Sequence, residues 1–95
     1  MTYDVACIAG TSRNQISGGA LNYWERMTGR KAHQCSCIGC QNPAEDGAHV
    51  VKVRWEAGQW HYDRNPQQYI VPMCHKCNEH EGYHMQVSTT LVPVP

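Results

Sequence analysis

The spacing of apolar residues along the chain predicts one helix near the N-terminus. Leu21, Trp24 and Met27 recur every three residues, which places them on one face of a helix over residues 20–28. Gly29 follows directly and is a common helix terminator. Trp24 is expected to anchor this helix in the core.

In the rest of the chain, alternating and β-branched apolar residues favour strands. The run from Ala48 to Trp55 alternates with one slip, and Ala57 and Gly58 lie in the turn signal that follows it. The tail, residues 86–95, is either a strand added to the sheet edge or a disordered arm. We expect strands over residues 48–55, 60–62 and 69–73, and a second helix from Cys74 to about Met85. Residues 3–8 are either a short strand or an ordered arm.

Composition narrows the class of protein. With 95 residues the chain is one domain with a modest core and no Phe, so a structural metal would add needed stability. Its formal net charge is zero, which argues against broad, non-specific affinity for nucleic acid. The N-terminus has no signal-peptide pattern, and no apolar run is long enough to cross a membrane. We therefore expect a cytoplasmic protein with reduced thiols, rather than a secreted one with three disulfides.

Cysteines in two clusters are the strongest chemical signal. Cys74 and Cys77 have the two-residue gap that allows two thiolates to bind one metal ion. The first cluster offers three sulfurs for two places, either Cys35 with Cys40 or Cys37 with Cys40. The clusters predict one structural zinc ion held by four thiolates.

A cysteine pair, a β-hairpin and a second pair that opens a helix follow the order of a treble-clef zinc finger. Residues 35–78 go further: C-x4-C, then G-A-H-V, then I-V-P-M-C-x2-C-N resembles the HNH nuclease family. This resemblance favours Cys35 over Cys37. It implies a small α+β fold, an HNH-like treble-clef ββα zinc module over residues 35–86 with an N-terminal arm and helical extension (1–34) and a tail (87–95).

The resemblance also implies a catalytic arrangement, which this chain matches only in part. His49 stands where the family's general base would be. Ala48 stands at the position of the metal-binding Asp, Tyr69 at that of an orienting Asn, and Asn78 at that of the helix ligand. Asp46 lies two residues too early. Because Ala48 has no ligand atom, the cation site for metal-assisted phosphodiester hydrolysis is incomplete.

Two functions follow from this partial match. The favoured one is a zinc-binding module without nuclease activity that binds protein or nucleic acid. The alternative is an active HNH-type endonuclease with His49 as general base and a rearranged cation site, built from His49, Asn78, His80 or Glu81. Arg30 and Lys31 are candidate contacts for phosphate or an acidic surface, and Trp60 is a candidate contact for a protein. Zero net charge favours a protein partner or self-association over nucleic acid, and no membrane contact is expected.

Overall fold

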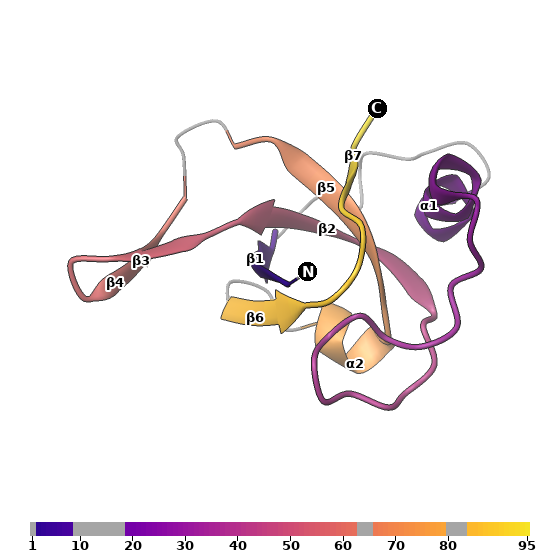
Figure 1. The fold of residues 1–95 in the computed structure, drawn as a ribbon, viewed down its shortest axis with the longest axis horizontal. Coiled ribbons are helices and arrows are strands. Elements are labelled where there is room, and N and C mark those ends of the chain that lie inside the picture. The colour runs from indigo at the N-terminus through magenta and orange to yellow at the C-terminus, as the bar shows by residue number, and fades with distance from the viewer. Residues whose placement is uncertain (1, 9–18, 63–65, 80–83) are drawn as a thin grey trace.

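The chain folds as a small α+β protein built on an antiparallel sheet. The computed structural model describes residues 2–8, 19–62, 66–79 and 84–95. A five-stranded sheet has the order β6-β1-β2-β5-β7, and β3 and β4 form a separate two-stranded hairpin (Figure 1). The elements are β1 (Tyr3–Cys7), α1 (Ala20–Thr28), β2 (Asp46–Lys52), β3 (Arg54–Glu56), β4 (Gln59–His61), β5 (Gln68–Met73), α2 (His75–Asn78), β6 (His84–Val87) and β7 (Val92–Pro93).

The central strand β2 divides the protein into two faces. It pairs with β5 without interruption from Asp46, opposite Met73, to Val51, opposite Gln68. Since side chains alternate along a strand, Asp46, Ala48, Val50 and Lys52 point to one face and the residues between them to the other. We call these the cysteine face and the helix face.

The cysteine face carries the larger core. Its buried apolar residues come from four strands and pack with two cysteines from the clusters. Cys7 lies in this core, and its thiol donates to Met73 Sδ at 3.8 Å. The buried set is Val5, Cys7, Cys35, Ala48, Val50, Val71, Met73, Cys74 and Val87.

Helix α1 covers the other face through Trp24, as the periodicity predicts, whereas Met27, which the same periodicity places beside Trp24, is 61% exposed. Gly29 ends it in the left-handed conformation, with its N–H bonded to the Glu25 carbonyl at 2.9 Å. Trp24 is only 4% exposed and packs against Ile70 and Val92. The Trp24 indole N–H donates to the Thr90 carbonyl at 2.9 Å, so the tryptophan ties the helix to the C-terminal segment. Its predicted role as a core anchor is confirmed.

The start of α1 lies unusually close to β2 at Gly47. A Cβ atom at this position would lie 2.5 Å from the backbone nitrogen of Leu21 and 2.6 Å from two atoms of Ala20. Real Cβ contacts are essentially never so short. Gly47 is therefore needed for helix packing, because only a residue without a side chain lets the backbones approach so closely.

Two predicted elements end earlier than expected. The strand predicted over residues 48–55 is two strands in different sheets. Between them the Val53 N–H donates to the Asp4 carbonyl at 3.0 Å, and β3 then leaves the main sheet. The turn at Ala57 and Gly58 is confirmed, with φ angles of 53° and 77°. Figure 1 shows the hairpin β3–β4 projecting from the body.

The helix predicted from Cys74 to Met85 is wrong at its C-terminal end. Helix α2 covers His75–Asn78, residues 80–83 lie outside the described part of the chain, and His84–Val87 is strand β6, paired with β1. Met85 and Val87 alternate with polar neighbours, which is a strand pattern. These residues form a strand because they pair with β1, which lies more than 80 positions earlier in the pair Tyr3–Val87.

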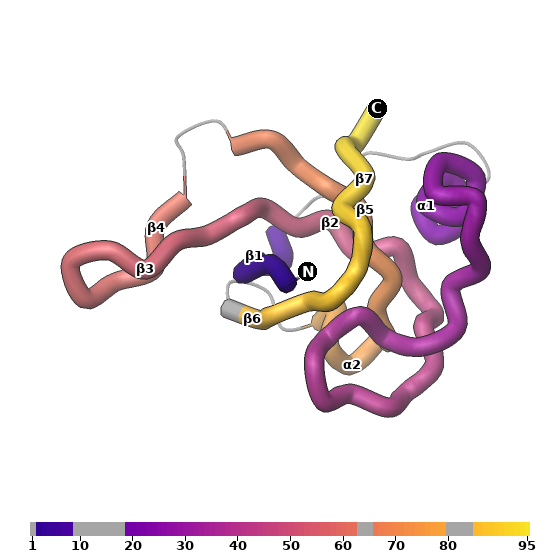
Figure 2. The backbone as a smooth tube through the Cα atoms, viewed as in Figure 1, coloured from indigo at the N-terminus to yellow at the C-terminus, as the bar shows by residue number. Residues whose placement is uncertain are grey.

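The N-terminal segment is not a helical extension of a separate zinc module. Strand β1 lies inside the sheet between β6 and β2, and α1 packs on β2, β5 and β7. Of the two alternatives predicted for the tail, the edge strand is confirmed, because β7 pairs with β5 at Tyr69 and Ile70. Figure 2 traces the segment that joins β6 to β7. Among the described residues, none of the helices has the length and apolarity needed to cross a membrane.

Candidate metal centre

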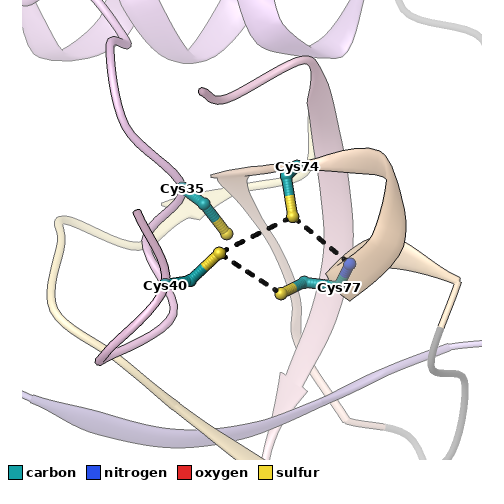
Figure 3. A group of neighbouring side chains, drawn as sticks. All are labelled: Cys35, Cys40, Cys74 and Cys77. Atoms are coloured by element: carbon teal, nitrogen blue, oxygen red, sulfur yellow. Dashed lines mark hydrogen bonds between the residues drawn. The ribbon is translucent and has the colours of Figure 1, made fainter. Parts of the chain in front are cut away.

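Four cysteines from two distant segments meet at one point. The sulfurs of Cys35, Cys40, Cys74 and Cys77 all lie within 4.8 Å of one another and point towards a common centre (Figure 3). The Cys40 sulfur is 3.8 Å from that of Cys74 and 3.9 Å from that of Cys77. A tetrahedral site with Zn–S bonds of about 2.3 Å has S···S edges of about 3.8 Å, so the cluster fits zinc. All six cysteines are free thiols.

The first cysteine pair sits in a loop closed by backbone hydrogen bonds. The Cys35 N–H donates to the Asn42 carbonyl at 2.9 Å, and the Ala44 N–H donates to the His33 carbonyl at 3.0 Å. At the loop tip Gly39 adopts a φ angle of 85°, which favours glycine. These bonds hold Cys35 and Cys40 on the same side of the loop, where both sulfurs face the second pair (Figure 3).

The second pair is positioned by the junction of β5 and α2. Cys74 caps α2, and its sulfur accepts the Cys77 backbone N–H at 3.4 Å and the Asn42 side-chain N–H at 3.8 Å. Burial raises the pKa of Cys74, but these hydrogen bonds outweigh it and bring the pKa down to about 7. A lowered pKa favours the thiolate form of Cys74, which is the form that binds a metal.

Cys37 lies outside the group of four. Its thiol donates to Met85 Sδ at 3.5 Å, and its backbone forms a bridge with Val87. Burial, followed by the charge of Cys35, raises the pKa of Cys37 to about 12, which keeps it a thiol. Of the two alternatives for the first pair, the geometry brings together Cys35 with Cys40.

His49 does not lie beside the residues that the HNH-like pattern assigns to the cation site. It lies on the helix face, opposite Ile70 in β5. Its Nε2 atom is buried and has no hydrogen-bond partner among the described residues. Burial lowers the pKa of His49, so its imidazole is neutral at pH 7.

The other positions of that pattern lie on the cysteine face. Ala48 is 1% exposed within the core, so the position of the metal-binding Asp is closed to solvent. Tyr69 is on the same face, because it pairs with Val50. Asn78 donates to the Asp46 carboxylate at 3.1 Å, next to α2. The backbone of the uninterrupted strand thus separates His49 from Asp46 and Asn78.

Asp46 is also engaged by α2 through His75. His75 Nδ1 lies 3.0 Å from the Asp46 carboxylate, and His75 Nε2 lies 2.8 Å from that of Glu79. The hydrogen bond to Asp46, followed by the charge of Glu79, raises the pKa of His75. These contacts fix α2 against the start of β2 and so help to hold Cys74 and Cys77 in place. His80 and Glu81, which the alternative cation site would use, lie outside the described residues.

The candidate contact residues are spread over different parts of the surface. Arg30 and Lys31 follow α1, and Arg30 donates to the Thr90 hydroxyl in the C-terminal segment at 3.4 Å. Trp60 is on the hairpin β3–β4, with its ring centroid 5.3 Å from that of Trp55. Sequence reasoning did not foresee the role of Asn42 beside Cys74, or the approach of Lys52 to Tyr3 and Tyr69. The position of Asn42, two residues after Cys40, was the sequence signal that could have indicated its contact with the cysteine cluster.

The fold and the site together describe a small α+β protein with four clustered cysteines that could hold a metal ion. Comparison with known proteins assigns it to no family, since no family model, curated protein or solved structure matches the chain.

Proposed function

We propose that this chain is a zinc-stabilised, HNH-like treble-clef module that lacks nuclease activity and binds a protein surface through the hairpin β3–β4. The observation that carries the binding role is the exposed pair Trp55 and Trp60 on a hairpin outside the main sheet. The most direct occupant to test is a second copy of the chain.

One structural zinc ion fits the cluster of four cysteines. Four thiolates fill a tetrahedral site and leave no position open for water, which is typical of structural rather than catalytic zinc. The N–H groups of Cys77 and Asn42 that donate to the Cys74 sulfur are the outer contacts that orient ligands in such sites. Zinc held here connects the loop before β2 to the start of α2.

The absence of nuclease activity is supported by the two faces of β2. A general base must reach the water that it activates. The buried Nε2 atom of His49 lies on the helix face, whereas the candidate oxygen ligands Asp46 and Asn78 lie on the cysteine face. An Asp in place of Ala48 would lie in the core beside the cysteines. A hard cation therefore lacks the carboxylate that would hold it next to His49.

The hairpin has the features of a contact surface. Trp55 is 61% exposed, Trp60 39% and Tyr62 62%. Three exposed aromatic side chains therefore lie within one short segment of the chain. Aromatic residues are enriched where proteins bind one another, and they often contribute most of the binding energy. Arg54 and Glu56 form an ion pair at 2.9 Å, which leaves the hairpin without a net positive charge for nucleic acid.

The hairpin also has strand edges suited to pairing. In the described part of the chain, β3 and β4 pair only with each other. Unpaired edges commonly add a strand from another chain. Two copies joined along such an edge would also bury their tryptophan pairs.

Sedimentation of the purified protein over a range of concentrations tests this proposal. We expect a monomer–dimer equilibrium that Trp60→Ala shifts towards monomer, with bound zinc and circular dichroism unchanged. Tyr23→Ala, at a half-buried aromatic on α1, is the control and should leave the equilibrium unchanged. A protein that stays monomeric at every concentration, or a dimer that Trp60→Ala leaves intact, would contradict self-association through the hairpin.

A cleavage assay tests the alternative function. We expect no specific cutting of plasmid or single-stranded DNA in the presence of Mg²⁺, Mn²⁺ or Ni²⁺. Cutting that is lost in His49→Ala but kept in Met27→Ala, which changes an exposed side chain on α1, would establish the nuclease and reject the non-enzymatic function.

A further inference from the structure

A cavity of about 460 Å³ lies on the cysteine face, at the end of β2 away from the four cysteines. Lys52 at the end of β2 and Arg30 after α1 both line it. These two cations are 22 positions apart in sequence and come together only in the fold. Asp46, beside α2, is six residues from Lys52 along the strand, about 20 Å away, so the cavity is separate from the metal centre.

Lys52 is held in place by two aromatic rings. Its Nζ atom lies 5.5 Å from the ring centroid of Tyr3 and 5.2 Å from that of Tyr69. Cation–π contacts of this kind orient an ammonium group without neutralising it. In the part of the chain that the structure describes, Lys52 forms no ion pair, and no acidic residue lines the cavity.

Arg30 and three hydroxyl groups supply the other polar groups of the lining, and Leu91 lies beside them. Arg30 Nη2 donates to the Thr90 hydroxyl at 3.4 Å, which positions the guanidinium group and leaves its other N–H groups to bind a ligand. Ser88 and Thr89, neighbours of Thr90, also line the cavity. Two cations with several hydroxyl donors are the chemistry that binds a phosphate group.

The geometry points to a binding site for a phosphate monoester that carries a flat organic group, as in a nucleotide. A phosphate monoester has a charge of about −1.5 to −2 at pH 7, which matches two cations better than the single charge of a carboxylate. The volume is in the range of pockets for whole small ligands, so the phosphate accounts for only part of it. The rings of Tyr3 and Tyr69 offer apolar surface for the rest. This site is independent of the hairpin proposed above as the protein contact.

The same chemistry has two sources, a free nucleotide or the 5′-phosphorylated end of a nucleic-acid strand. Titration calorimetry with adenosine 5′-monophosphate, adenosine, and a short oligonucleotide with and without its 5′-phosphate distinguishes them. We expect binding of the monophosphate or of the phosphorylated strand, and none of adenosine. Lys52→Gln and Arg30→Gln should each raise Kd by about 10- to 100-fold.

Lys31→Gln is the matched control, because it removes the same charge from the residue next to Arg30 but does not line the cavity. It should leave Kd unchanged, and all three variants should keep the circular dichroism and bound metal of the wild type. Four results would overturn the inference: no binding of either phosphorylated ligand, equal binding of adenosine, equal binding of the unphosphorylated strand, or an equal loss of affinity in Lys31→Gln.

Discussion

Replacing Cys35 and Cys37 separately by serine is the most direct test of the metal centre. The two residues belong to the same loop and receive the same chemical change. Only the sulfur of Cys35 is among the four within 4.8 Å of one another, whereas the Cys37 thiol contacts Met85. Cys35→Ser should therefore bind zinc more weakly, and Cys37→Ser should bind it as the wild type does.

The size of the difference follows from the number of ligands. A structural zinc site contributes roughly 10–16 kcal/mol of apparent binding free energy at pH 7, or roughly 2.5–4 kcal/mol for each of four thiolates. Loss of one ligand then weakens zinc binding by roughly 100- to 1,000-fold. A domain of this size has a free energy of unfolding on the order of 5–15 kcal/mol, so complete removal of zinc should unfold it. Cys37→Ser removes one weak thiol–thioether contact and should cost about 1 kcal/mol or less.

Bound metal is measured by elemental analysis of the purified proteins, and folding by circular dichroism during titration with a strong chelator. We expect one zinc per chain in the wild type and in Cys37→Ser, and loss of both zinc and structure at far lower chelator concentration in Cys35→Ser. If Cys37→Ser loses zinc while Cys35→Ser retains it, the arrangement of ligands is wrong. If the wild type holds no zinc and stays folded in chelator, the metal centre itself is refuted.

Three further substitutions test the packing. Gly47→Ala places a Cβ 2.5 Å from the Leu21 nitrogen, so it should lower the free energy of unfolding by about 1–3 kcal/mol. Tm should then fall by roughly 4–8 °C per kcal/mol, and an unchanged melting curve would contradict this close approach. Trp24→Phe removes the indole hydrogen bond to Thr90 and should lower the free energy of unfolding in urea by about 1 kcal/mol or more, whereas equal stability would show that the bond contributes nothing. His49 has a pKa lowered from its ordinary 6.5, so below about pH 6.5 the unfolded chain takes up more protons than the folded one and stability falls. That fall, measured by urea unfolding from pH 7.5 to 5.5, should be smaller in His49→Gln, and identical profiles would show that His49 is not protected from protonation.

Local patterns were sufficient where neighbours in sequence decide the structure. The three-residue spacing around Trp24 and the stop at Gly29 identify α1. The gap between Cys74 and Cys77 brings both sulfurs to one point, because Cys74 caps the helix that carries Cys77. In each case the geometry is set within one or two helical turns.

Distant partners decided what the patterns left open. The choice between Cys35 and Cys37 depends on β6, which pairs with the Cys37 backbone and receives its thiol, and β6 itself exists through pairing with β1. The role of Gly47 depends on the start of α1, more than 20 residues earlier. Residue spacing carries no information about such contacts, so the HNH-like positions could be matched in order while His49 and Asp46 came to lie on opposite faces.

The hairpin β3–β4 leaves and re-enters the sheet at neighbouring positions, since Val51 of β2 pairs with Gln68 of β5. Doubling the length of such a connection costs only about 0.6 kcal/mol in closure entropy. The connection also begins at the end of β2 that is farthest from the four cysteines. Its sequence and length can therefore change while the end of the fold that carries the four cysteines stays the same, so that related proteins could acquire new binding partners by exchanging this one segment.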